Sequence, residues 1–275
     1  MHLADEYRAL KDAGRRDLGG VAVRNLLVLM TEQSHLFLRS AETKPLKSRV
    51  LDKSYVAFAL GNKISRAVNA ALFISDPAEL AASLTAFADG SLARANPIGI
   101  QRTLYTLTMS FCAANDLWKV GDKKTPATYF EFLIGHLFAE RLGVNPRKWI
   151  PVPGEARSSL PTDYIFELGP RRANFHLPVK LSTRERVIQA WAHQRVIDGI
   201  YGVKTYRGCL VVLAETKLDQ KTLEVVEICL PLQWRVYQKY IAELWRIYYI
   251  DPPARYADLA GVKPIGVLYD ELDTS

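Results

Sequence analysis

The segment at residues 209–215, CLVVLAE, constrains the fold of this 275-residue chain more than any other feature. It is a continuous apolar run, without the alternation of apolar and polar residues that marks a strand with one solvated face. A strand that is apolar on both sides must be covered on both sides, which is typical of the central strand of a sheet with helices on both faces. The run therefore predicts an α/β protein.

Two shorter segments before this strand are expected to pair with each other. Residues 162–168 alternate in polarity, residues 169–174 are of turn-forming types, and residues 175–181 read as a second strand, which together predict a β-hairpin. Residues 184–200 and 232–248 are further expected to be helices, and residues 223–230 a strand. This order predicts a mixed sheet with helices on both faces.

The first half of the chain has helical periodicity. Apolar residues recur at helix spacing over residues 18–38 and 50–74. Asp76-Pro77 and Asn96-Pro97 each combine an N-cap residue with proline at the first helical position, so each pair predicts a helix start. We therefore expect an all-helical N-terminal region.

A polar stretch at residues 115–124, NDLWKVGDKK, interrupts that periodicity. We place a domain boundary within it, which gives a helical domain at residues 1–118 and a second domain at residues 119–275. The helical domain is expected to serve dimerisation, DNA contact or both. The second domain is expected to begin with a helix that ends at Gly143, a typical C-terminal glycine.

The composition is that of a globular protein, with 49% hydrophobic and 24% charged residues. No apolar run approaches the roughly 18 residues that a membrane span requires, so we expect no membrane partner. The three cysteines form no CxxC pair and have no histidine at ligand spacing, which is typical of reduced thiols. We therefore expect a cytoplasmic protein.

The positive charge is concentrated in one place. The chain has 36 Lys and Arg against 29 Asp and Glu, a net charge of +7. Residues 171–195 contain one acid, Glu185, and a group of cationic residues: Arg171, Arg172, Lys180, Arg184, Arg186 and Arg195. Such a cluster is expected where a phosphate backbone approaches a protein, although a solvated helix face is the alternative.

A carboxylate and a lysine are expected to meet at one edge of the hairpin. Asp163 lies on one face of its strand, and His176, Pro178 and Lys180 share one face of the next. An Asp that holds Mg²⁺ and a Lys that offsets developing negative charge are the minimum for metal-assisted phosphodiester hydrolysis. The alternative is an ordinary structural pair, since both residue types occur near strands in any α/β protein.

A second carboxylate is needed to hold the metal. Glu131 stands between Phe130 and Phe132 in an otherwise apolar helix, where burial would be costly without a partner such as a metal. A solvated position on the helix is the alternative reading for Glu131. Glu167 and Glu185 are weaker candidates.

The order Arg184-Glu185-Arg186 stands where a strand passes into a helix. Arginine is the commonest reader of guanine, and Glu can accept a hydrogen bond from cytosine, so this cluster could read C·G pairs. Gln189 follows one helical turn later and could add a base or backbone contact.

The run Lys180-Leu-Ser-Thr-Arg184-Glu185-Arg186-Val-Ile-Gln189 resembles the catalytic and recognition segment of type II restriction endonucleases of the PD-(D/E)xK superfamily. It is similar to the branch that cuts CCGG or CCNGG sites, and the resemblance extends from about residue 125 to the C-terminus. It implies a mixed five-stranded sheet flanked by helices, Mg²⁺ as cofactor and double-stranded DNA as partner.

The resemblance also implies a role for each matching residue. Asp163 would bind the metal, Lys180 would be the motif lysine, and Glu131 would match an acid on the helix before the sheet. Base reading would fall to Arg184, Glu185, Arg186 and Gln189. The remaining cations of the cluster, Arg171, Arg172 and Arg195, are expected to contact DNA.

The sequence departs from this family at the second acid. Pro178 stands two residues before the lysine, where an acid is usual, and His193 stands where that acid would be if it had moved to the following helix. His193 could serve as ligand or base, Glu131 could take over, or the site could be degenerate.

These observations together predict a Mg²⁺-dependent endonuclease that cuts a C/G-containing palindrome in double-stranded DNA. A palindromic target requires a symmetric assembly, so we expect a homodimer or a higher homo-oligomer. The helical region or the aromatic segment at residues 232–248 could form its interface. Two alternatives stay open: a structure-specific repair or junction nuclease, and a catalytically inactive DNA-binding protein.

Overall fold

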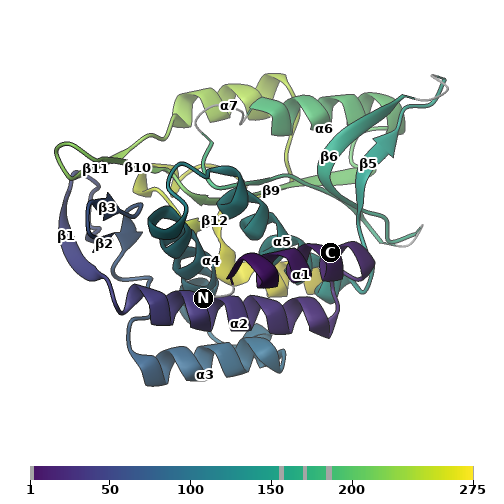
Figure 1. Cartoon of the computed structure of the whole chain (residues 1–275). Coiled ribbons are helices and arrows are strands. Elements are labelled where there is room, and N and C mark those ends of the chain that lie inside the picture. The colour runs from purple at the N-terminus through teal and green to yellow at the C-terminus, as the bar shows by residue number, and fades with distance from the viewer. Residues whose placement is uncertain (1–2, 155–157, 170–171, 184–187, 275) are drawn as a thin grey trace.

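The computed structural model describes residues 3–154, 158–169, 172–183 and 188–274. Its main element is a mixed sheet in the order β13-β12-β9-β7-β6-β5, with β8 also paired to β9 (Figure 1). The strands are β5 (Arg147–Pro151), β6 (Ser159–Phe166), β7 (Asn174–Leu177), β8 (Val179–Lys180), β9 (Tyr206–Ala214), β12 (Arg246–Asp251) and β13 (Val262–Pro264). The α/β class and the mixed sheet are confirmed. The expected number of five strands is too low, because this sheet has seven within the described residues.

The apolar run that opened the sequence analysis forms β9, the strand at the centre of this sheet. It pairs in parallel with β12 on one side and with β7 and β8 on the other. Leu210 and Val212 pack into one hydrophobic cluster, whereas Cys209 and Val211 pack into another. Both faces of β9 are therefore covered, as the sequence predicts.

Helices supply those covers. Figure 1 shows α6 (Ile188–Tyr201) and α7 (Pro231–Tyr240) along one face of the sheet, and α4 (Pro97–Trp118) and α5 (Lys124–Leu142) on the other. Trp191 of α6 and Trp234 of α7 pack together with ring centroids 5.1 Å apart. Both tryptophans belong to the cluster that includes Leu210 and Val212.

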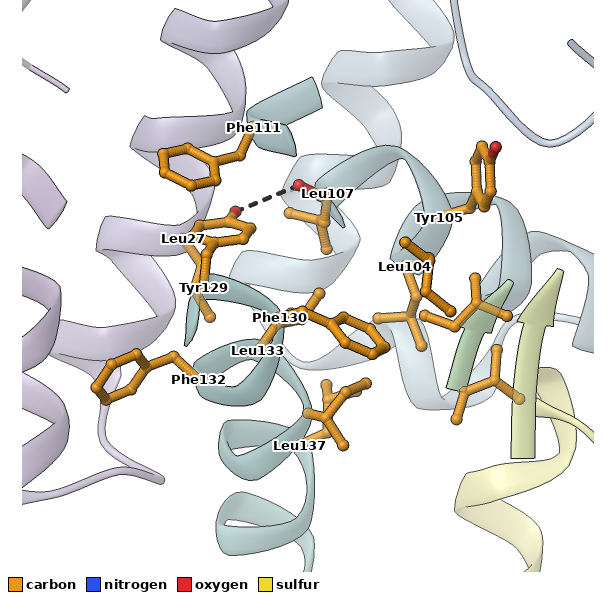
Figure 2. Close-up of a cluster of buried hydrophobic side chains, with 14 of the residues drawn as sticks. Leu27, Leu104, Tyr105, Leu107, Phe111, Tyr129, Phe130, Phe132, Leu133 and Leu137 are labelled. Carbon is orange, nitrogen blue, oxygen red and sulfur yellow. Dashed lines mark hydrogen bonds between the residues drawn. The ribbon is translucent and has the colours of Figure 1, made fainter. Parts of the chain in front are cut away.

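The larger core lies around α4 and α5 (Figure 2). The rings of Phe111 and Tyr129 stack with centroids 4.2 Å apart, and the Tyr129 hydroxyl donates to the Leu107 carbonyl at 3.3 Å. Leu27 of α2 (Val21–Leu38) and Leu133 of α5 are fully buried in the same cluster. Packing against this core fixes the position of α5, and with it the position of the α5 residues that face away from the core.

The predicted hairpin is confirmed as β6 and β7. The two strands are antiparallel, with Tyr164 opposite Leu177 and Phe166 opposite Phe175. Pro178 separates β7 from β8, and its carbonyl still accepts a hydrogen bond from the Val211 N–H at 2.9 Å. The chain therefore continues along β9 as far as Lys180.

The N-terminal region has the expected helices, but it is not all helical. The helices α1 (Leu3–Arg16), α2, α3 (Pro77–Ala88) and α4 are present, and Asp76 and Asn96 cap α3 and α4 through their side chains. The helix expected over residues 50–74 is wrong. This stretch forms short strands instead: β2 (Tyr55–Leu60), β3 (Lys63–Ile64) and β4 (Val68–Asn69).

Those strands belong to a second sheet, in the order β10-β11-β1-β2-β3 with β4 paired to β2. Its other strands are β1 (Glu42–Ser48), β10 (Thr216–Asp219) and β11 (Glu224–Glu227). The segment predicted as a strand at residues 223–230 therefore supplies β11 of this sheet. Antiparallel pairing of β2 with its near neighbours β1, β3 and β4 overrides the helical spacing of alanines at residues 50–74.

The helix expected over residues 232–248 is also only partly correct. The helix α7 ends at Tyr240, and the following aromatic run becomes strand β12. Tyr248 and Tyr249 of β12 are fully buried and Trp234 is 2% exposed, so these aromatic residues belong to the core. Tyr240, by contrast, is 71% exposed and lies on the surface.

One hydrophobic cluster crosses the expected domain boundary. It contains Leu10 and Leu27 from the N-terminal region as well as Phe138, Phe166 and Val211 from the sheet and α5. The division at residue 118 stays a prediction. The chain ends with α8 (Leu268–Asp273), and none of the helices in the described ranges is long and apolar enough to cross a bilayer.

Candidate active site

Asp163 and Lys180 meet at the end of the hairpin. The Lys180 ammonium donates to the Asp163 carboxylate, with Nζ 2.7 Å from Oδ2. Both side chains are about a quarter exposed, at 25% for Lys180 and 23% for Asp163. The contact follows from the strand pleat, which places both residues on one face of the sheet. Their catalytic roles stay a prediction.

The backbone also holds Asp163. The Val179 N–H donates to Asp163 Oδ2 at 2.8 Å. Because Pro178 interrupts the strand just before it, this N–H lies beside the end of β6 and binds the carboxylate. No hydrogen bond to Asp163 Oδ1 is found among the described residues, which leaves that oxygen available to a cation.

Glu131 reaches the same place from α5, on the opposite face of the sheet from α6. Burial raises the pKa of Glu131, and the negative charge of Asp163 raises it further. Lys148, Lys180 and Lys124 lower the pKa of Glu131 in part. Glu131 is therefore close enough to Asp163 for the Asp163 carboxylate to disfavour the ionisation of Glu131.

These two acids fit a hard divalent cation. Within the described part of the chain, no group of three or more His, Cys, Asp or Glu side chains is arranged to hold a metal ion. Mg²⁺ does not require such a group, since it is usually bound through one or two carboxylates with water and substrate phosphate completing the shell. A cation between Asp163 and Glu131 would also remove the repulsion that raises the pKa of Glu131.

A cavity of about 160 Å³ opens beside Asp163 on the α6 face. Asp163, Lys180, Gln189 and His193 all line it, so four of the predicted site residues lie together. Burial lowers the pKa of His193, which keeps its imidazole neutral near pH 7 and able to accept a proton or a metal. Pro178 lines the cavity as well but contributes no acid there.

His176, which the sequence analysis placed on this face without a role, is fixed beside the cavity by Gln194. The Gln194 amide donates to Asp198 at 2.8 Å and to the Tyr206 carbonyl at 2.9 Å, so its oxygen must face the other way. That oxygen lies 3.0 Å from His176 Nδ1, which therefore carries the proton. Burial lowers the pKa of His176 to about 4, and the ring is neutral.

His176 Nε2 is consequently a buried acceptor with no partner among the described atoms. Its ring centroid lies 6.2 Å from that of His193 across the cavity wall. The strand pattern put His176 on the face of Lys180, but nothing in the sequence showed that Gln194 would fix its tautomer.

Glu215 is another residue that the sequence analysis missed. It directly follows β9 and is 1% exposed. Its carboxylate accepts hydrogen bonds from the N–H of Thr183 at 3.3 Å, from the Thr183 hydroxyl and from the Tyr249 hydroxyl at 2.8 Å. Glu215 thereby anchors the chain between Lys180 and the predicted base-reading cluster. Its place at the end of an apolar strand was the signal that could have marked it.

The remaining predicted residues are placed as follows. Arg195 is exposed on α6, and Arg172 is exposed next to α5, where it donates to the Leu142 carbonyl at 3.4 Å. Arg171, Arg184, Glu185 and Arg186 lie outside the described residues. The structure thus brings Asp163, Lys180, Gln189 and His193 together around one cavity. Glu131 lies near enough for the charges of Asp163 and Lys180 to shift its pKa.

Comparisons with known proteins agree with this fold. No family model matches the chain, and no curated protein matches it. A crystal structure of the type IIP restriction endonuclease Kpn2I is similar with a TM-score of 0.85 and 25% identity, over 99% of this chain and 96% of that one. A complex of the restriction endonuclease PspGI with substrate DNA gives a TM-score of 0.47 and 11% identity, over 72% of this chain and 91% of that one. The likeness to Kpn2I confirms the restriction-endonuclease-like fold.

The pKa of Glu131 gives a testable consequence for stability. The folded state raises this pKa above its usual 4.5, so ionised Glu131 destabilises the folded protein. This destabilisation is absent below pH 4.5 and reaches its full size above the pKa of Glu131 in the folded state. We expect Glu131→Gln to be more stable than the wild type at about pH 8 in a chelator, on the order of 1 kcal/mol, with the difference vanishing towards about pH 4. Urea unfolding over this pH range measures it.

Mg²⁺ should reverse the order of stability of the wild type and Glu131→Gln if Glu131 helps to hold the cation. Titrating Mg²⁺ at about pH 8 should raise the unfolding midpoint of the wild type more than that of Glu131→Gln. A variant that is less stable than the wild type in the chelator would show instead that a protein partner compensates Glu131.

Proposed function

We propose that this chain is a Mg²⁺-dependent, sequence-specific endonuclease that cuts double-stranded DNA. The observation that carries the proposal is the Asp163–Lys180 contact at the end of the hairpin, with Glu131 on the adjoining helix. The likeness of nearly the whole chain to a type IIP restriction endonuclease supports the same activity.

The residues divide the work as their positions allow. Asp163 and Glu131 would hold Mg²⁺, which when bound polarises the phosphodiester and lowers the pKa of a bound water. Lys180 places a positive charge where the phosphate gains negative charge. His193 offers a neutral imidazole in the same cavity, where it can accept a proton from water.

We assign recognition of the DNA sequence to the segment that follows Lys180. Arg184, Glu185 and Arg186 would read C·G pairs, Gln189 would add a contact from the first turn of α6, and Arg171, Arg172 and Arg195 would contact the backbone. We infer a C/G-containing palindrome such as CCGG or CCNGG as the target. A homodimer, or a higher homo-oligomer, would present this segment to both half-sites.

The protein is proposed to act in the cytoplasm, where its three cysteines, all free and buried, would remain reduced.

One alternative function has a specific observation in its favour. Pro178 supplies no second acid in the cavity, which is what a catalytically inactive DNA-binding protein would show.

Incubation with a mixed-sequence plasmid separates these functions. With Mg²⁺ the wild type should produce discrete ends that map to one C/G-rich palindrome when sequenced. A structure-specific nuclease would give ends without a common sequence, and an inactive binder would leave the plasmid uncut in both Mg²⁺ and Mn²⁺.

Lys180→Ala should abolish cleavage of that plasmid while leaving binding in Ca²⁺ largely intact, because the lysine acts on the phosphate and Ca²⁺ can still occupy the carboxylates. Lys63→Ala, which removes an exposed lysine from β3, is the matched control and should cut normally. Gel-shift assays and cleavage rates measure the two effects. Unchanged cleavage by Lys180→Ala would refute the role of this lysine.

Replacing Arg186 tests base reading. Arg186→Ala should cost about 1–3 kcal/mol in binding to the target and should relax discrimination at one base pair. The measurement is a set of dissociation constants for the target and for its single-base variants. An equal loss for every sequence would make Arg186 a phosphate contact.

A further inference from the structure

A second hollow adjoins the candidate site from the other side of the sheet. It has a volume of about 430 Å³ and is lined by α1, α5, the start of β5 and Tyr164 of β6. We call it the α1–β5 groove. Figure 1 shows α1 and α5 close together beside the β5–β6 edge.

Three cations line the α1–β5 groove: Lys11, Arg15 and Lys148. Within the described residues, Lys11 and Lys148 form no salt bridge, and Arg15 has only a 3.4 Å contact with Asp12, in which both side chains are mostly exposed. Such exposed pairs contribute little, so Arg15 remains available to another anion. Asp17 lies nearby but accepts a hydrogen bond from Asn145 at 3.2 Å.

Aromatic rings position the two lysines. The Lys148 ammonium lies 5.0 Å from the centroid of the Tyr164 ring and 5.7 Å from that of Phe132. The Lys11 ammonium lies 5.0 Å from the centroid of the Tyr7 ring. A ring face attracts the cation without using all its N–H donors, so both ammonium groups can still bind an anion.

The groove is lined by residues that neighbour the candidate active-site acids in the sequence. Tyr164 is the neighbour of Asp163 in β6, and Phe132 is the neighbour of Glu131 in α5. Lys148 is also close enough to Glu131 to lower its pKa. Lys148 and Asp163 therefore both lie near Glu131, so DNA bound at Asp163 would have the cations of the groove nearby.

We propose that the α1–β5 groove binds the sugar–phosphate backbone of the DNA next to the scissile phosphate. The inference rests on the proposed nuclease function, and it assigns α1 a direct part in DNA binding. Exposed lysine and arginine side chains bind phosphate oxygens, and such contacts carry no sequence information. The contacts are therefore independent of sequence.

The test is the salt dependence of binding, measured in Ca²⁺ so that no DNA is cut. Each phosphate contact that is lost should reduce the slope of log K against log salt by about 0.9. Lys11→Ala/Arg15→Ala should therefore lower it by about 1.8, equally for target and non-target DNA. Both residues lie at the surface of α1, so the fold should be kept.

Lys63→Ala/Lys217→Ala is the matched control, because it removes the same charge from exposed positions of the second sheet. Its slope should equal that of the wild type. Lys148→Ala and Lys148→Gln form a second pair of variants, each expected to lower the slope by about 0.9, with circular dichroism to confirm folding.

The outcomes separate this proposal from the nuclease assignment. If Lys11→Ala/Arg15→Ala keeps the wild-type slope, the proposed role of the groove is wrong, whether or not the plasmid is cut. A loss confined to the target sequence would also overturn it, since base contacts would then be responsible. A uniform loss of slope, with ethylation of phosphates beside the bound site no longer interfering with binding, would support it even in a protein that does not cleave DNA.

Discussion

The candidate site depends on the hydrogen bonds that hold Asp163. Its Oδ2 atom accepts from the Lys180 ammonium and from the Val179 N–H, one a side chain and the other backbone. Both donors follow Pro178, which has no N–H of its own and ends β7. Pro178 thus stands where the usual acid is absent, and the next residue, Val179, supplies the backbone N–H that orients the remaining carboxylate.

The charges around Asp163 show why a cation suits this place. Burial and the charge of Asp163 raise the pKa of Glu131, while Lys148 and Lys180 lower it in part. Lys180 is already bound to Asp163, and Lys148 rests on the rings of Phe132 and Tyr164. The pKa of Glu131 stays raised in spite of both lysines, so a divalent ion held by the two acids would further stabilise the ionised form of Glu131.

The sequence predicted the features that depend on short-range geometry. The face shared by Asp163 and Lys180 follows from the alternation of a strand, and the buried centre of the sheet follows from the apolar run at residues 209–215. It failed where packing and strand pairing override residue spacing. Residues 50–74 became strands because β2 pairs with β1, β3 and β4, although the alanines there are spaced as in a helix. The approach of Glu131 depends on how α5 packs on the sheet, so spacing alone could only suggest it. The tautomer of His176 depends on Gln194, Asp198 and Tyr206 together, and no local pattern encodes that.

Glu215 connects the two sheets to the segment that would read DNA. The residue after it, Thr216, begins β10, which pairs with β11, and β11 pairs with β1 of the N-terminal region. The carboxylate of Glu215 holds Thr183, the last described residue before Arg184-Glu185-Arg186. Burial raises the pKa of Glu215, but the Thr183 and Tyr249 donors favour its ionised form, so the carboxylate is retained for the hydrogen bonds it accepts. Strand pairings, the Glu215–Thr216 peptide bond and the hydrogen bonds of Glu215 therefore connect the N-terminal region to Thr183, although the two lie more than a hundred residues apart in the sequence.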